Sequence, residues 1–95
     1  AAMSSPVPFA DPVALTRALV RVDSRNPDLV PGAPGERDAA ALLAGVLAGW
    51  GFAVETHEAA PGRPNVLARV GRGEPGAPVL MLNGHLDVVG TDGMT

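Results

Sequence analysis

The feature that most limits how this chain can fold is an unbroken apolar run from Val79 to Leu82, which leads directly into Asn83-Gly84-His85-Leu86-Asp87. A strand with one wet face alternates apolar and polar residues, whereas a continuous apolar run is typical of a strand covered on both faces. Sheets of that kind have helices packed against them, so the run predicts an α/β fold. We take Val79 to Leu82 as its central strand.

The first helix is predicted from about Pro12 to Val22. Asp11 can accept hydrogen bonds from free backbone N–H groups, and the fixed φ of Pro12 suits the first helical position. Apolar residues then recur at helical spacing. The segment from Asp23 to Pro27 ends the helix, because the residue before a proline resists the α conformation.

A second helix is predicted from Glu36 to Trp50, where apolar residues again follow one face. Gly51 stands where a helix commonly terminates. Trp50 could stack on a ligand, but its place on the apolar face favours packing in a core or an interface.

Two further strands are predicted before the apolar run, from Phe52 to Thr56 and from Asn65 to Val70. Gly and Pro residues between positions 72 and 76 predict a chain reversal. The expected fold is therefore a partial α/β domain over residues 11–95 with two helices and about three strands, preceded by an N-terminal extension over residues 1–10.

Composition excludes several classes of function. The net charge of −3 and the absence of a basic cluster give no reason to expect nucleic-acid binding. No apolar stretch reaches the roughly 20 residues of a membrane-spanning helix, and residues 1–10 do not resemble a signal peptide, so a cytoplasmic protein is expected. Without cysteine, a transition metal must be held by His and carboxylates.

His85 and Asp87 are the candidate site residues. They follow the predicted central strand, and loops at the carboxyl ends of strands are where α/β proteins place ligand sites. One imidazole nitrogen of His85 can bind a metal while the other donates a hydrogen bond to Asp87, which orients the ring. His-x-Asp is a short motif, however, and a lone histidine is commonly structural.

The residues around His85 and Asp87 provide further evidence about the function. The sequence from Val79 to Val89, an apolar strand followed by Gly-His-Leu-Asp-Val-Val, resembles the signature of the zinc-dependent amidohydrolase and metallopeptidase family of acetylornithine deacetylase, succinyl-diaminopimelate desuccinylase, aminoacylase and glutamate carboxypeptidase. Three more family-like stretches occur in the same order: Ser24 to Pro27, Trp50 to Phe52, and Arg63 to Arg69. Several ordered matches rarely arise by chance.

The resemblance implies a partial three-layer zinc-peptidase-like catalytic domain, of which residues 11–95 are the truncated N-terminal part. It implies two zinc ions in the complete enzyme, with Co²⁺ as a substitute, His85 as a metal ligand and Asp87 as the catalytic aspartate that orients it. A bridging Asp, a general-base Glu, further carboxylate ligands and a second His are expected downstream of Thr95.

The implied activity is metal-dependent hydrolysis of the amide bond in small-molecule N-acyl amino acids, of the deacetylase or desuccinylase type, or in short peptides. The complete enzyme is expected to be a homodimer, and this chain alone is expected to be inactive. The alternatives are a non-catalytic α/β binding or interaction module and a structural domain in which His85 and Asp87 only close a loop. Four other polar side chains are interpreted as turn or surface residues, as is the second histidine: Arg25, Asn26, Asn65, Asp92 and His57.

Overall fold

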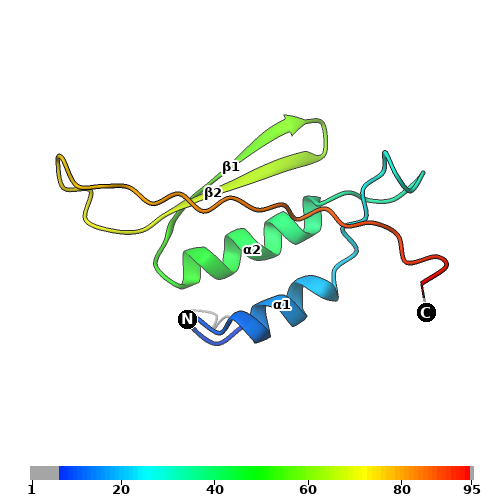
Figure 1. Cartoon of the computed structure of the whole chain (residues 1–95), viewed down its shortest axis with the longest axis horizontal. Helices are drawn as coiled ribbons and strands as arrows, with labels where there is room; N and C mark the ends of the chain where they lie inside the picture. Colours follow the sequence, from blue (N-terminus) through cyan, green and yellow to red (C-terminus); the bar gives the residue numbers. More distant parts are fainter. Residues whose placement is uncertain (1–6, 95) are drawn as a thin grey trace.

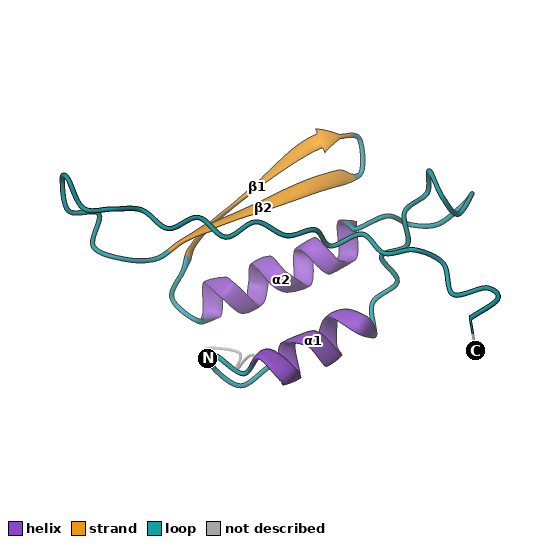
Figure 2. Ribbon diagram, viewed as in Figure 1, coloured by secondary structure: helices purple, strands orange, loops and turns teal. Residues whose placement is uncertain are grey.

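The computed structural model describes residues 7–94 and is a small α/β structure. Its elements follow in the order helix, helix, strand, strand: α1 (Pro12–Val20), α2 (Arg37–Gly49), β1 (Ala53–Ala60) and β2 (Arg63–Arg69). The α/β class, both helices and the first two strands agree with the expectation from sequence. Figure 1 shows these elements in chain order, and Figure 2 separates the helices from the strands by colour.

The start of α1 is fixed by the predicted cap. The Asp11 carboxylate accepts a hydrogen bond from the backbone N–H of Ala14 at 3.0 Å, and Pro12 occupies the first helical position. The helix ends at Val20, two residues before the predicted end. There the backbone tightens, because the N–H of Val22 bonds to the carbonyl of Leu19 at 3.1 Å, one residue closer than in an α-helix.

The apolar face of α2 supplies most of the buried core. Ala39, Ala40 and Val46 are buried. Beyond the helix, Gly51 has φ +95°, the left-handed conformation that commonly ends a helix and that side-chain-bearing residues adopt only with strain. Trp50 packs edge-to-face against Phe9 with ring centroids 5.9 Å apart, as expected of a packing residue.

The strands β1 and β2 form an antiparallel hairpin in which Thr56 faces Val66, with an irregularity between Glu58 and Ala60. Helix α2 packs against both strands, and α1 packs against α2 rather than against the sheet. The structure therefore has three tiers, hairpin, α2 and α1 (Figures 1 and 2). Among residues 7–94, no helix has the length and apolar character needed to cross a membrane.

The predicted central strand is not formed, and this expectation was wrong. Val79 to Leu82 lie in an extended loop, drawn in orange in Figure 1, and their side chains are 75–91% exposed. A strand is defined by hydrogen bonds to a neighbour, and β1 and β2 pair only with each other in the part of the chain that the structure describes. The apolar run is therefore left uncovered. The Cα radius of gyration is 15.2 Å, above the roughly 13 Å of a compact chain of 100 residues.

Candidate metal centre

The segment that carries His85 and Asp87 is attached to the loop after α1. Val88 and Arg25 form an isolated parallel bridge. The N–H of Val88 donates to the carbonyl of Ser24 at 3.0 Å, and the N–H of Asn26 donates to the carbonyl of Val88 at 2.9 Å. These bonds place the segment beside a loop more than 60 positions earlier in the chain, so the site is built from two distant parts of the sequence.

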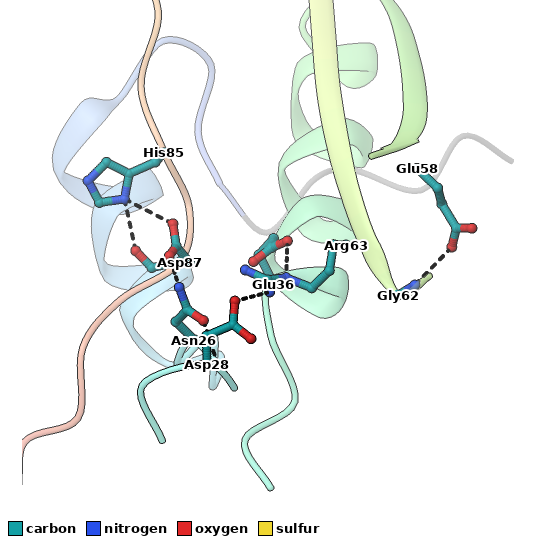
Figure 3. A network of polar contacts seen from close by, with 8 residues as sticks. All are labelled: Asn26, Asp28, Glu36, Glu58, Gly62, Arg63, His85 and Asp87. Atoms are coloured by element: carbon teal, nitrogen blue, oxygen red, sulfur yellow. Dashed lines mark hydrogen bonds and ion pairs between the residues drawn. The ribbon is translucent and has the colours of Figure 1, made fainter. Parts of the chain in front are cut away.

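His85 and Asp87 lie together. Nδ1 of His85 is 2.9 Å from the backbone carbonyl oxygen of Asp87 and 3.2 Å from its Oδ1 (Figure 3). Both neighbours of Nδ1 are hydrogen-bond acceptors, so the neutral ring carries its proton there and keeps a lone pair on Nε2. The His85 side chain is 83% exposed, whereas that of Asp87 is 30% exposed. The imidazole is thus free to bind a ligand through Nε2.

Asp87 is held from the other side by Asn26. The Nδ2 group of Asn26 donates a hydrogen bond to Oδ2 of Asp87 at 2.8 Å (Figure 3). This bond, and after it the charge of His85 when the ring is protonated, keeps the pKa of Asp87 below its ordinary value of 3.8, while partial burial acts the other way. Asp87 is therefore an ionised hydrogen-bond acceptor at neutral pH.

An ion pair lies beside this site. Nε of Arg63 is 2.7 Å from Oε1 of Glu36, and its Nη1 is 3.8 Å from Oδ2 of Asp28 (Figure 3). The hydrogen bond to Glu36 raises the pKa of Arg63, and the charges of Glu36, Asp28 and Asp87 act in the same direction. The second carboxylate oxygen of Glu36 is buried and has no hydrogen-bond partner among residues 7–94. The guanidinium thus links the hairpin to the loops around Asp87.

The other polar residues considered from sequence are mostly where they were expected. His57 lies exposed on β1, with Nε2 3.0 Å from Oε2 of Glu55. Arg25 makes two hydrogen bonds to the carboxylate of Asp23, at 2.8 and 2.7 Å. The remaining two are exposed: Asn65 and Asp92.

Asn26 is the residue whose role the sequence interpretation missed. It was expected to be a turn or surface residue, and it does form a turn, because its Oδ1 accepts the N–H of Asp28 at 2.8 Å. Its contact with Asp87 joins residues 61 positions apart. The sequence did contain one signal for this role. Asn26 lies in a family-like stretch, Ser24 to Pro27, even though that stretch is remote from the His-x-Asp motif.

Zinc in proteins is bound by histidine nitrogens, cysteine thiolates and carboxylate oxygens. His85 fits as one nitrogen ligand with a carboxylate partner on its other nitrogen. Within residues 7–94, no group of three or more His, Cys, Asp or Glu is arranged to hold a metal ion. An open, mainly apolar groove of about 500 Å³ borders His85, between the end of α1 and the segment from Leu86 to Met94. The described residues therefore offer one candidate ligand, His85, and an adjoining groove.

Two curated proteins are similar to this chain. The succinyl-diaminopimelate desuccinylases of Gluconobacter oxydans and of Methylobacterium sp. are each 43% identical to it over 82 residues. The matched segment covers 83% and 82% of this chain but 19% and 18% of those proteins, so the chain spans about a fifth of the length of the curated relatives it matches. No family model matches, and no solved structure matches.

The similarity extends over most of the chain rather than over the His-x-Asp motif alone. It agrees with the family that the motifs resemble. Over the segment that it shares with these relatives, the chain is similar to the succinyl-diaminopimelate desuccinylases.

Proposed function

We propose that this chain carries the first metal-ligand segment of a zinc-dependent amidohydrolase that cleaves N-acyl amino acids of the deacetylase or desuccinylase type. In this proposal, the chain contributes part of a zinc-peptidase-like α/β domain, and the rest of a longer, homodimeric enzyme supplies the remaining ligands and the general base. The relatives' names support the substrate class, since both are desuccinylases.

The observation that carries the proposal is the contact between His85 and Asp87. Nδ1 of His85 is occupied by oxygen atoms of Asp87, so Nε2 is left as a metal-binding lone pair on an exposed ring. Carboxylate partners of this kind fix the orientation of metal-binding histidines and raise their basicity. His85 would hold zinc through Nε2, and Asp87 would orient the ring.

When bound, a zinc pair supplies a Lewis acid for the amide carbonyl and a water of lowered pKa. The contribution of this chain is to present Nε2 in one orientation and to keep Asp87 ionised beside it. The groove next to His85 is apolar, which suits the aliphatic part of an acylated amino acid better than its carboxylate.

Zinc titration followed by NMR tests the ligand assignment. Added Zn²⁺ should shift the imidazole signals of His85, and His85→Ala should remove this binding. Asp87→Asn should weaken it by roughly 10–100-fold, the range for outer partners of metal-binding histidines. His57→Ala is the matched control, because His57 is also exposed and also contacts a carboxylate. The proposal would be contradicted if His57→Ala abolishes Zn²⁺ binding and His85→Ala does not.

A second experiment addresses activity. A hydrolytic zinc site needs about three protein ligands and a base, and the described residues offer one ligand. We therefore expect no hydrolysis of N-succinyl-diaminopimelate or N-acetylornithine by this chain with added Zn²⁺ or Co²⁺. Metal-dependent turnover that His85→Ala abolishes would show that the chain completes a site by itself. A non-catalytic binding module is the alternative if zinc does not bind at His85.

A further inference from the structure

We propose that Asn26 is a positioning residue for the candidate metal centre: by holding the Asp87 carboxylate, it adds a second fixed acceptor to the Asp87 backbone carbonyl at Nδ1 of His85 and so favours the ring orientation with Nε2 outward. This inference rests on the proposed function for its consequence in metal binding. The contact that carries it is the 2.8 Å hydrogen bond from Nδ2 of Asn26 to Oδ2 of Asp87 (Figure 3).

The Asn26 side chain has only one orientation that satisfies both of its ends. Its Oδ1 accepts the backbone N–H of Asp28 at 2.8 Å, and its Nδ2 donates to Asp87. If the amide were turned over, the NH₂ group would face an N–H and the oxygen would face a carboxylate, so both bonds would be lost. The donor is therefore directed at Asp87 by the turn that Asn26 itself forms.

The backbone of Asn26 is also held on both sides. Its N–H donates to the carbonyl of Val88 at 2.9 Å, and its carbonyl accepts the N–H of Val30 at 2.8 Å. On the far side of this loop, the carbonyl of Arg25 accepts the N–H of Gly35 at 3.1 Å. Asn26 is thus a fixed point against which the carboxylate of Asp87 is positioned.

The two oxygens of Asp87 have separate partners. Oδ2 accepts the hydrogen bond from Asn26, which leaves Oδ1 facing Nδ1 of His85 at 3.2 Å. A carboxylate held at one oxygen loses its freedom to rotate about its terminal bond, which otherwise has a broad torsional minimum. Without the Asn26 donor, Oδ1 no longer has a fixed position opposite His85. The effect of Asn26 on His85 must therefore pass through Asp87.

The test is the tautomer of neutral His85, measured by the ¹⁵N shifts of its imidazole in the 95-residue chain without metal. The wild-type ring should carry its proton on Nδ1. Asn26→Ser keeps an oxygen that can accept the N–H of Asp28, but it removes the amide donor to Asp87. This variant should increase the share of the tautomer with the proton on Nε2, while the Asp87 backbone carbonyl, 2.9 Å from Nδ1, keeps part of the population in the wild-type tautomer. Asn65→Ser is the matched control, because Asn65 is exposed on β2, and it should leave the tautomer unchanged.

A double-mutant cycle separates positioning from a structural role. If Asn26 acts through Asp87, then Asn26→Ser should have no further effect on the tautomer in the Asp87→Asn background. The amide signals of Val88 and Gly35 report whether the loop bridge persists. If Asn26→Ser disrupts the bridge, Asn26→Asp decides instead, because it keeps the acceptor for Asp28 and replaces the donor by a carboxylate oxygen that repels the carboxylate of Asp87. An unchanged tautomer with the bridge intact would overturn the inference.

Zinc titration then links the inference to the site. Asn26→Ser should weaken Zn²⁺ binding at His85 by about tenfold, the lower end of the range for outer partners of metal-binding histidines. If the wild-type chain does not bind Zn²⁺ at His85, the proposed function is wrong, but the effect of Asn26 on the tautomer of His85 is still supported. If the tautomer population of His85 is the same in Asn26→Ser as in the wild-type chain, the positioning role of Asn26 is wrong, even if Zn²⁺ binds at His85.

Discussion

Arg63 and Glu36 meet in an ion pair of 2.7 Å although they are 27 positions apart, and the pair joins the first residue of β2 to the residue before α2. The Glu36 side chain is 12% exposed and that of Arg63 is 25% exposed. Arg63 also contacts the loop that carries the site, because its Nη1 lies 3.8 Å from Oδ2 of Asp28. This contact therefore helps to hold the Asn26 loop against the hairpin.

Removing Arg63 should destabilise the fold, because it leaves the nearly buried carboxylate of Glu36 without its counter-ion. We expect Arg63→Ala to lower the Tm, measured by circular dichroism. Arg72→Ala is the control, since Arg72 is 90% exposed and lies 3.9 Å from Glu74. Equal Tm values for the two variants would show that the Arg63 pair contributes no more than a surface contact.

Asp23 should show a pH dependence set by Arg25. The hydrogen bond from the Arg25 side chain, followed by that from its backbone N–H, lowers the pKa of Asp23 below 3.8. A lowered folded-state pKa gives stability that is present above the unfolded value and is lost as pH falls through the folded value. In an NMR titration, Arg25→Gln should raise the pKa of Asp23. As a control, the pKa of Glu55, which the hydrogen bond with His57 lowers, should be unchanged by Arg25→Gln.

Replacing either of two glycines near the end of α2 by alanine should change the stability of the protein, but in opposite directions. Gly51 has φ +95°, so Gly51→Ala should cost about 1–2 kcal/mol of stability through backbone strain. Gly45 lies within α2 with no atom within 4 Å of an added Cβ, so Gly45→Ala should stabilise by about 0.5–1 kcal/mol. Urea unfolding measures both. Effects of the same sign would contradict the assigned helix end.

The cap of α1 is a further test. Asp11→Ala removes the acceptor for the N–H of Ala14 and should cost about 0.5–2 kcal/mol. Asp11→Asn keeps a capping oxygen and should lose much less. The comparison is made by thermal unfolding at neutral pH. If Asn were as harmful as Ala, the charge rather than the hydrogen bond would account for the effect.

The helices could be predicted because their signals are local. Asp11, Pro12 and Gly51 act on neighbouring backbone groups, and they mark the start of α1 and the end of α2 in the structure as they do in the sequence. The early end of α1 at Val20 depends on a tightened turn that no residue type announces. The sequence therefore located both helices to within a few residues.

The strand from Val79 to Leu82 and the role of Asn26 could not be predicted in the same way, because both depend on distant partners. Apolar composition shows that a segment can form a strand, but only a neighbour makes it one. Likewise, nothing in the spacing of Asn26 and Asp87 indicates that they meet across 61 positions. The contact between His85 and Asp87, by contrast, could be expected from their two-residue spacing, although the strand that was predicted before them is not formed.

The exposed run at Val79 to Leu82 has a consequence for the behaviour of the chain in solution. From Ala77 to Gly84 the sequence carries no charge, and its backbone in this region has no strand to pair with among the described residues. An extended, uncharged apolar segment is a template on which strands from other molecules can add. Pro78 cannot donate a ladder hydrogen bond, so it limits such pairing at one end only. Preparations of this chain should therefore lose soluble monomer as concentration rises, and a charged residue placed within the run should delay that loss.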